Sequence, residues 1–131
     1  IGGESKAALR RTARLGDGWF PAANNPKFRI DSSESLSTRL NVFWHLCEEE
    51  KREFSELDLG FFYTGLISSD AITGEGGKRQ IFTGNPSDIA SDIASFRNVG
   101  LDTIIFRMER PSLSETLDLI EWFGSEIRPI L

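Results

Sequence analysis

The sequence has almost none of the cysteine and histidine side chains that bind zinc or form disulfides. It contains one cysteine, Cys47, and one histidine, His45, among 131 residues. A single cysteine cannot form an intrachain disulfide, and no cluster of cysteine, histidine and carboxylate residues has the spacing of metal ligands, so we expect no metal site. Scarce cysteine is typical of proteins in a reducing compartment, and we predict a cytoplasmic location.

Long apolar runs and an excess of basic residues are missing as well. No stretch approaches the roughly 18 apolar residues that a membrane span requires, and the formal net charge is −5. The composition therefore gives no reason to expect binding to a membrane or to nucleic acid. Ile1 is not an initiator methionine, and no signal segment follows it. We expect that the chain is preceded by a further segment.

Two familiar nucleotide-binding motifs are also absent. The pattern G-x-G-x-x-G occurs nowhere in the chain. Residues 74–79 (GEGGKR) superficially resemble a phosphate loop, but Ile72 stands where the first glycine is required, and neither Ser nor Thr follows Lys78. We interpret this stretch as a mobile connection between elements.

What the sequence does contain is a regular alternation of helix and strand patterns. The predicted helices begin at capping signals at Ser5, Asp31 (with Glu34 completing a capping box), Asn85 and Ser112. The predicted strands cover residues 18–21, 57–64 and 103–106, with Ile1 as the last residue of an earlier strand and residues 80–82 as a weaker candidate. We expect the first helix to end at Gly16 in a left-handed conformation.

This alternation indicates an α/β fold with a parallel sheet covered by helices. Two architectures fit the pattern: a doubly wound open sheet, and a piece of a (β/α)₈ barrel. A full barrel needs roughly 250 residues, so about four β/α units in a chain of this length would form half of one. Both architectures bind ligands at the carboxyl ends of the strands. Residues 2–5, 21–25, 63–65 and 107–109 lie at that edge of the predicted sheet.

The turn Gly2-Gly3-Glu4-Ser5 is the best candidate for an anion-binding site. Glycines let a phosphate approach the backbone closely, and Ser5 caps a helix whose free N–H groups and positive dipole end point to the same place. A carboxylate at Glu4 would repel a phosphate unless it turns away or meets a sugar hydroxyl. By local pattern alone, a plain strand-to-helix turn is the commoner explanation.

Arg107 is a second candidate at this edge, because it directly follows the strand at residues 103–106. It could pair with a phosphate or a carboxylate of a ligand, or equally with Glu109 or a neighbouring loop. The basic residues of the first helix have no interleaved aromatic side chains, and we interpret them as a solvated outer face. No acid–base pair or nucleophile can be assigned, so the catalytic residues are unknown.

Motifs at both ends of the chain follow a recognisable pattern. They are Ile1-Gly2-Gly3-x-Ser5, residues 8–14 (ALRRTAR), residues 16–19 (GDGW) with Pro21, residues 83–86 (TGNP), residues 100–102 (GLD) and residues 126–131 (EIRPIL). Together they resemble the bacterial luciferase-like monooxygenase superfamily, and most closely its branch that uses the deazaflavin coenzyme F420. The resemblance is weakest over residues 24–80.

The resemblance implies that the chain is the C-terminal half of a (β/α)₈ barrel and begins at the end of the fifth strand. It implies a flavin or F420-dependent oxidoreductase that performs hydride transfer or oxygen insertion on a small organic substrate. F420 is the expected cofactor and FMN the alternative, since Ala8 stands where some members carry a hydroxyl. The cofactor-binding residues that carry over are Gly2, Gly3, Glu4 and Ser5, with Arg107 as a weaker candidate. The ring-contacting residues would belong to the N-terminal half of the barrel.

Two other hypotheses stay open at this point. A non-catalytic half-barrel would pair with a second copy or with another half, because an open sheet exposes strand edges and apolar faces. An independent flavodoxin-like domain would need a complete first strand and a flavin phosphate loop, and the sequence shows neither. Under the leading hypothesis the partners are a small-molecule substrate and the N-terminal half of the barrel, with a homodimer as a further option.

Overall fold

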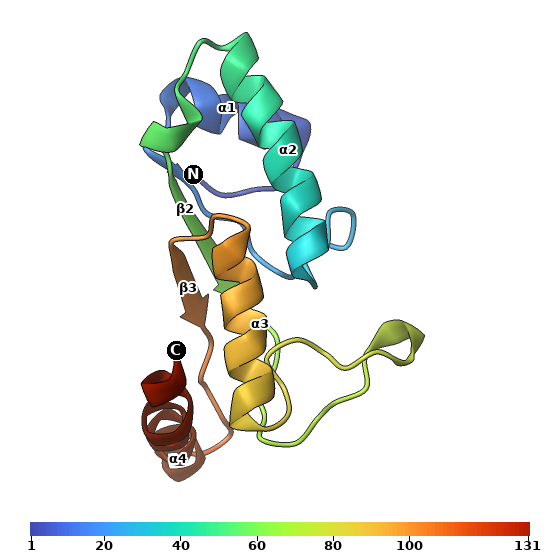
Figure 1. Cartoon of the computed structure of the whole chain (residues 1–131), viewed down its shortest axis with the longest axis vertical. Helices are drawn as coiled ribbons and strands as arrows, with labels where there is room; N and C mark the ends of the chain where they lie inside the picture. Colours follow the sequence, from blue (N-terminus) through green and yellow to red (C-terminus); the bar gives the residue numbers. More distant parts are fainter.

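The computed structural model describes residues 1–131, apart from the side chain of Glu75, and it confirms the predicted α/β class. Figure 1 shows strands and helices alternating along the chain. The described strands are β1 (Gly18–Trp19), β2 (Asp58–Tyr63) and β3 (Thr103–Phe106), and the α-helices are α1 (Lys6–Leu15), α2 (Ser33–Glu49), α3 (Pro86–Asn98) and α4 (Leu113–Trp122). The strands form a parallel sheet in the order β1-β2-β3.

Ile1 lies beside β1 in the manner of a further parallel strand. Its terminal nitrogen donates to the carbonyl of Gly18 at 2.8 Å, and its carbonyl accepts from the N–H of Phe20 at 2.9 Å. Two bonds that straddle Trp19 in this way are the pattern of a parallel ladder. The bonding of Ile1 therefore agrees with the prediction that it ends a strand.

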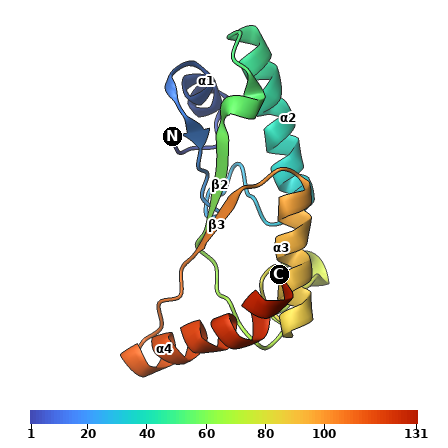
Figure 2. The same ribbon diagram turned by 60° about the vertical axis from the view of Figure 1, so that its left-hand side comes forward.

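The helices α2 and α3 lie along one face of the sheet, and the hydrophobic core fills the space between (Figure 2). Successive side chains of a strand point to opposite faces of a sheet. The strand side chains that pack into the core are Leu59, Phe61 and Tyr63 of β2 and Ile104 and Phe106 of β3. On the opposite face Ile105 is 47% exposed and Phe20 is 37% exposed, so this second face of the sheet is open.

The predicted starts of α1, α3 and α4 are confirmed. Ser5, Asn85 and Ser112 each accept a hydrogen bond from the backbone N–H three residues later. Such caps stabilise a helix by about 1 kcal/mol each.

The prediction for the start of α2 was wrong by one residue. Its capping box joins Ser32 and Ser35, not Asp31 and Glu34. The side chain of Asp31 instead forms an ion pair with Arg29 at 3.4 Å.

Two other local predictions were wrong. Gly16 ends α1 in an extended conformation (φ −100°, ψ 157°) rather than a left-handed one, and its N–H donates to the carbonyl of Thr12. A side chain there would approach that carbonyl oxygen to 3.0 Å, which explains the glycine without a left-handed φ. Residues 80–82 form no strand: Gln80 has no regular structure, and residues 81–82 form a turn. Phe82 has a left-handed φ of 58° within this turn, which breaks any extended run.

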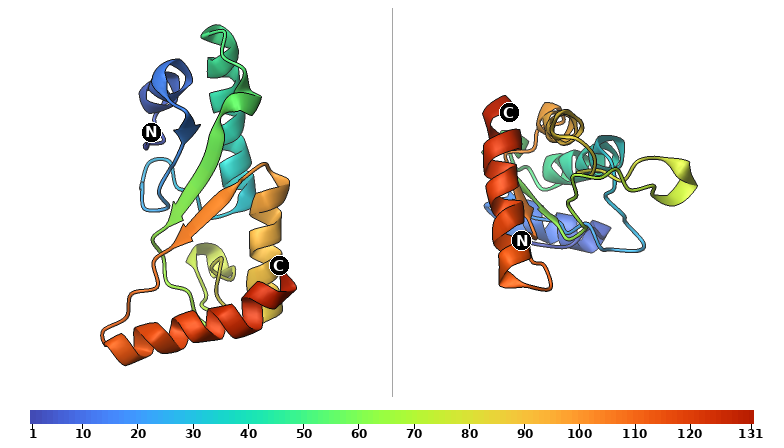
Figure 3. Two further views of the ribbon diagram at one scale, coloured as in Figure 1. Left: turned by 90° about the vertical axis from the view of Figure 1, so that its left-hand side faces the viewer. Right: turned by 90° about the horizontal axis from the view of Figure 1, so that it is seen from below.

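The last helix carries apolar residues at Leu117, Ile120, Trp122 and Phe123, and only part of this stripe is covered. Trp122 and Phe123 are half-buried, but Leu117 and Ile120 of the same apolar stripe are 55% and 48% exposed. Figure 3 shows the reason, since α4 runs across the end of the sheet instead of lying along it. Leu119 and Trp122 of α4 pack against the core. The π-helical turn Phe123–Ile127 continues this contact, and the ring of Phe123 lies 5.4 Å from that of Phe106.

The basic residues of α1 lie on its exposed side, as predicted, but two of them also form ion pairs with α2. Arg10 forms an ion pair with Glu49 and a second one, at 3.2 Å, with Glu50. Arg14 also reaches Glu50, at 3.5 Å. Such partly exposed pairs contribute about 0–1 kcal/mol each, and here they join α1 to the C-terminal end of α2.

Candidate functional site

The carboxyl ends of the strands lie side by side, as the alternation predicted. Beyond β1, the carbonyl of Pro21 accepts from the N–H of Phe62 at 2.9 Å. Beyond β2, the carbonyl of Tyr63 accepts from the N–H of Arg107 at 3.3 Å. The loops that leave β1, β2 and β3 therefore start from one continuous edge.

At this edge, the turn at residues 2–5 is bent sharply at Gly3. Gly3 has a φ of +101°, which side-chain-bearing residues rarely adopt, and a Cβ there would lie 2.9 Å from the Cβ of Ala8. The Gly3 carbonyl accepts from the indole N–H of Trp19 at 2.8 Å. At Gly2, a Cβ would lie 3.3 Å from the carbonyl oxygen of Phe20, tighter than most van der Waals contacts. The turn is therefore held against β1 from inside the protein.

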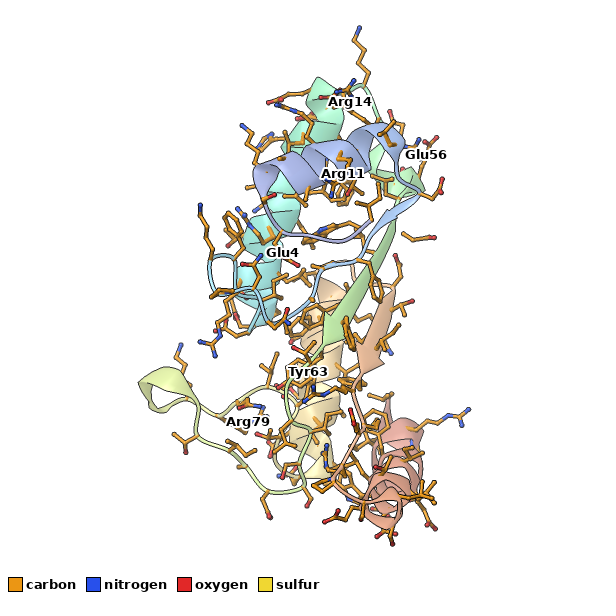
Figure 4. All side chains as sticks on the ribbon, turned by 180° about the vertical axis from the view of Figure 1, so that it is seen from behind. Glu4, Arg11, Arg14, Glu56, Tyr63 and Arg79 are labelled. Atoms are coloured by element: carbon orange, nitrogen blue, oxygen red, sulfur yellow. The ribbon has the colours of Figure 1, made fainter. Side chains whose placement is uncertain are left out.

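Glu4 is buried, and its carboxylate turns toward the loop after β1. One carboxylate oxygen accepts from the N–H of Ala22 at 2.9 Å, and the other accepts from the side-chain amide of Asn25. The backbone carbonyl of Glu4 accepts from the guanidinium of Arg39, on α2, at 3.1 Å. Figure 4 shows Glu4 beside α2, well inside the molecule. Repulsion of a phosphate by this carboxylate, the objection raised by the sequence, is weakened because both oxygens already bind donors.

Ser5 closes the turn and starts α1. Its hydroxyl oxygen accepts from the N–H of Ala8 at 3.2 Å. The first N–H groups of a helix have no acceptor within the helix, and they carry the positive end of its dipole. The N–H groups of Lys6 and Ala7 therefore favour a negatively charged ligand at the start of α1.

Arg107 lies apart from this turn. It is the residue after β3 and follows Ile105 by two positions, which places it toward the open face of the sheet, and it is exposed. Ile1, β1, β2 and β3 lie in this order, so Arg107 is about three strand spacings, roughly 14 Å in a flat sheet, from the turn. In the part of the chain that the structure describes, no ion pair joins Arg107 to Glu109.

A cavity of about 790 Å³ opens beside the carboxyl edge. It lies between the loop after β1 and the long segment that joins β2 to α3, residues 64–85, which we call the excursion. Its charged lining residues are Arg29, Asp31, Glu34, Lys78 and Arg79. Sequence reasoning did not predict this cavity, because the excursion showed no regular pattern and its path depends on distant contacts.

Those contacts attach the end of the excursion to the sheet and to α3. Arg79 forms a two-fold ion pair with Asp92 of α3, at 2.7 and 2.8 Å, and hydrogen bonding to Asp92 raises the pKa of Arg79. Burial raises the pKa of Tyr63, so its hydroxyl keeps its proton and donates to the carbonyl of Ile81 at 3.0 Å. Figure 4 shows Tyr63 at the end of β2 and Arg79 on the excursion.

Within the described residues, no set of three histidine, cysteine, aspartate or glutamate side chains is placed to hold a metal ion. None of the described helices has the length and apolar character needed to cross a membrane.

No protein-family model matches the sequence, and no curated protein matches it. Solved structures do match. The coenzyme F420-dependent tetrahydromethanopterin reductase from Methanopyrus kandleri superposes with a TM-score of 0.66 at 12% identity, over 98% of this chain and 49% of the reductase chain. An F420-dependent secondary alcohol dehydrogenase, solved in complex with an F420–acetone adduct, superposes with a TM-score of 0.64 at 10% identity, over 99% of this chain and 48% of the dehydrogenase chain.

The chain therefore spans about half the length of each of these enzymes. The likeness confirms the predicted fold class, half of a (β/α)₈ barrel. Both neighbours are F420-dependent enzymes, the kind of protein that the opening motif resembles. At 10–12% identity the similarity is one of fold.

Proposed function

We propose that this chain is the C-terminal half of a luciferase-like oxidoreductase and provides the anion-binding side of its cofactor site. Coenzyme F420 is the proposed cofactor, and FMN is the alternative. The observation that carries the proposal is the glycine turn at the carboxyl edge, which leads directly into the N-terminus of α1. Barrel enzymes bind their ligands at this edge, and both structural neighbours depend on F420.

In this proposal the turn holds the phosphate side of the cofactor. The backbone at Gly2 and Gly3 carries no side chain that would keep a phosphate away, and the hydroxyl of Ser5 and the first N–H groups of α1 supply donors. Arg107, about three strand spacings from the turn, adds positive charge at another point of the same edge. The cofactor ring would supply the hydride or oxygen chemistry on a small organic substrate, while this half of the protein supplies position and electrostatics.

The substitution Gly3→Ala tests the site in the full-length protein. We expect it to weaken F420 binding about tenfold, or about 1.4 kcal/mol. The left-handed φ of Gly3 and the contact with Ala8 would force the turn, and its N–H groups, to move. Binding is measured by fluorescence titration with F420 and, separately, with FMN.

The matched control is Gly76→Ala, because Gly76 also has a left-handed φ, of 74°, but a Cβ there meets nothing within 4 Å. The control should bind F420 like the unchanged protein. If the unchanged protein binds neither cofactor, the proposed function is wrong. If Gly3→Ala is folded and binds as well as the control, the turn is not the anion site.

A second candidate function is a non-catalytic half-barrel that works by pairing with a second copy. It is favoured by the open face of the sheet and by the apolar stripe of α4, where Leu113 is 75% exposed and Leu117 is 55% exposed. Monomeric proteins rarely leave large contiguous apolar patches exposed.

This candidate predicts that the 131-residue chain is a dimer and that Leu117→Lys makes it monomeric. Gel filtration with light scattering measures the mass of each. Leu15→Lys is the control, because Leu15 is also exposed, at 77%, but lies on α1. A well-folded monomer of the unchanged chain would contradict self-pairing.

A further inference from the structure

We propose that Glu4 is a positioning residue of the anion site and not one of its ligands. Its carboxylate holds the loop after β1 against the glycine turn, and its backbone carbonyl joins the same turn to α2. This inference rests on the proposed function, because it concerns how the turn is kept in shape to receive the cofactor phosphate.

The carboxylate of Glu4 is committed to the protein on both oxygens. Glu4 is 5% exposed, and its two partners, the N–H of Ala22 and the amide of Asn25, belong to the loop that follows β1. A buried carboxylate with two such donors is stabilised where it is, since turning it outward would leave both donors without an acceptor. Glu4 is therefore not available to a ligand in this arrangement.

The partners of Glu4 are themselves held in place. The side-chain oxygen of Asn25 accepts from the N–H groups of Lys27 and Phe28, at 3.0 and 3.3 Å, which leaves its amide nitrogen facing Glu4. The guanidinium of Arg39, which donates to the Glu4 carbonyl, lies over the ring of Phe28 at 4.7 Å. The loop thus holds the side chain of Glu4, and Arg39 of α2, which lies over Phe28 of that loop, holds its backbone carbonyl.

The consequence for the site lies in the orientation of one peptide unit. The carbonyl of Glu4 and the N–H of Ser5 belong to the same planar peptide and point in opposite directions. When Arg39 holds this carbonyl toward α2, the N–H of Ser5 points away from α2. Glu4 and its partners therefore set the direction of the Ser5 N–H, a donor that directly precedes the Lys6 and Ala7 N–H groups that the proposed function assigns to the phosphate.

The pairing of Glu4 with Asn25 matches an acceptor to a donor, and exchanging the two groups tests it. Glu4→Gln places an amide against the amide of Asn25, whereas Asn25→Asp places two carboxylates together. In the double variant Glu4→Gln/Asn25→Asp, the amide at position 4 can donate to the carboxylate at position 25. Its oxygen can still accept from Ala22, and the carboxylate at position 25 can still accept from Lys27 and Phe28.

The measurement is the dissociation constant of the full-length protein for two probes, F420 and the deazaflavin chromophore without its phosphate tail. We expect each single variant to bind F420 about tenfold more weakly, and the double variant to return to within about threefold of the unchanged protein. Binding of the tail-less chromophore should stay within about twofold in all variants, because the turn contacts only the anionic side. A general loss of folding would weaken the binding of both probes together.

Each outcome decides a separate point. If the unchanged protein does not bind F420, the proposed function fails. The positioning role is overturned if the unchanged protein binds F420 and the single variants bind F420 equally well. It is also overturned if the single variants lose affinity for F420 and for the tail-less chromophore in parallel. If the double variant is no better than the single variants, the Glu4–Asn25 pairing is overturned. Should Asn25→Asp fail to fold, Asn25→Ala removes the donor without adding a charge. It is expected to weaken the binding of F420 but not the binding of the tail-less chromophore.

Discussion

Replacing Trp19 by alanine is expected to lower the free energy of unfolding by about 3–5 kcal/mol. Trp19 is 1% exposed, its ring lies 5.7 Å from that of Phe43, and its N–H donates to the carbonyl of Gly3 at 2.8 Å. The substitution removes the largest side chain between the sheet and α2, and it leaves a cavity. Domains of ordinary size are stable by only about 5–15 kcal/mol, so this loss is a large share of the total.

Two variants make the test of Trp19 specific. Trp44→Ala removes the same side chain from the outer surface of α2, where Trp44 is 44% exposed, and it should cost at most about 1 kcal/mol. Trp19→Phe keeps an aromatic ring but loses the bond to Gly3, which adds about 1 kcal/mol to the cost of the smaller ring. Urea denaturation, monitored by circular dichroism, gives the free energy of unfolding of all three variants. A Trp19→Ala variant no less stable than Trp44→Ala would contradict the assigned core.

Trp19 also shows which parts of the fold the sequence could predict. The strands at β2 and β3, and the caps at Ser5 and Asn85, depend on neighbouring residues and were predicted closely. Local patterns of this kind are visible in a window of a few residues. The Trp19 side chain could be assigned to a strand in the same way, but its bond to Gly3, sixteen residues away, could not.

The candidate site was predictable in part for the same reason. The glycine turn and its place at the carboxyl edge followed from the alternation of elements, and the role of Ser5 as a cap followed from its position. The partners of Glu4 did not, because Asn25 and Arg39 are 21 and 35 residues away and carry no local signal of that contact. The burial of a glutamate is rare unless it is paired, and the partner is known only once the chain is folded.

The exposed stripe of α4 has a different cause. Apolar residues at helical spacing show that one face of a helix is apolar, but they do not show what covers that face. In the described chain the stripe at Leu113 and Leu117 faces solvent. The two solved enzymes that share the fold are about twice as long as this chain. In a complete (β/α)₈ barrel the helices form a ring around the strands, so each helix has neighbours on both sides.

The substitution Asp92→Ala is the second change with a large expected effect, a loss of about 2–3 kcal/mol in the free energy of unfolding. The carboxylate of Asp92 accepts two bonds from Arg79 and a third, at 2.7 Å, from the N–H of Phe82. Phe82 is fully buried among the rings of Tyr63, Phe96 and Phe106. Removing the acceptor leaves a buried N–H without a partner and releases the end of the excursion.

The release of the excursion can be measured apart from global stability. Trypsin cleaves after Lys78 and Arg79, and we expect Asp92→Ala to speed this cleavage about tenfold, because the excursion opens locally before the whole domain unfolds. Asp70→Ala is the matched control, since Asp70 is an exposed aspartate of the same excursion and its loss should change neither rate nor stability. Arg79→Lys keeps the positive charge but loses the two-fold pairing of the guanidinium with Asp92. Its cleavage rate should lie between those of Asp92→Ala and Asp70→Ala. If Asp92→Ala is cut no faster than Asp70→Ala, the ion pair does not anchor this segment.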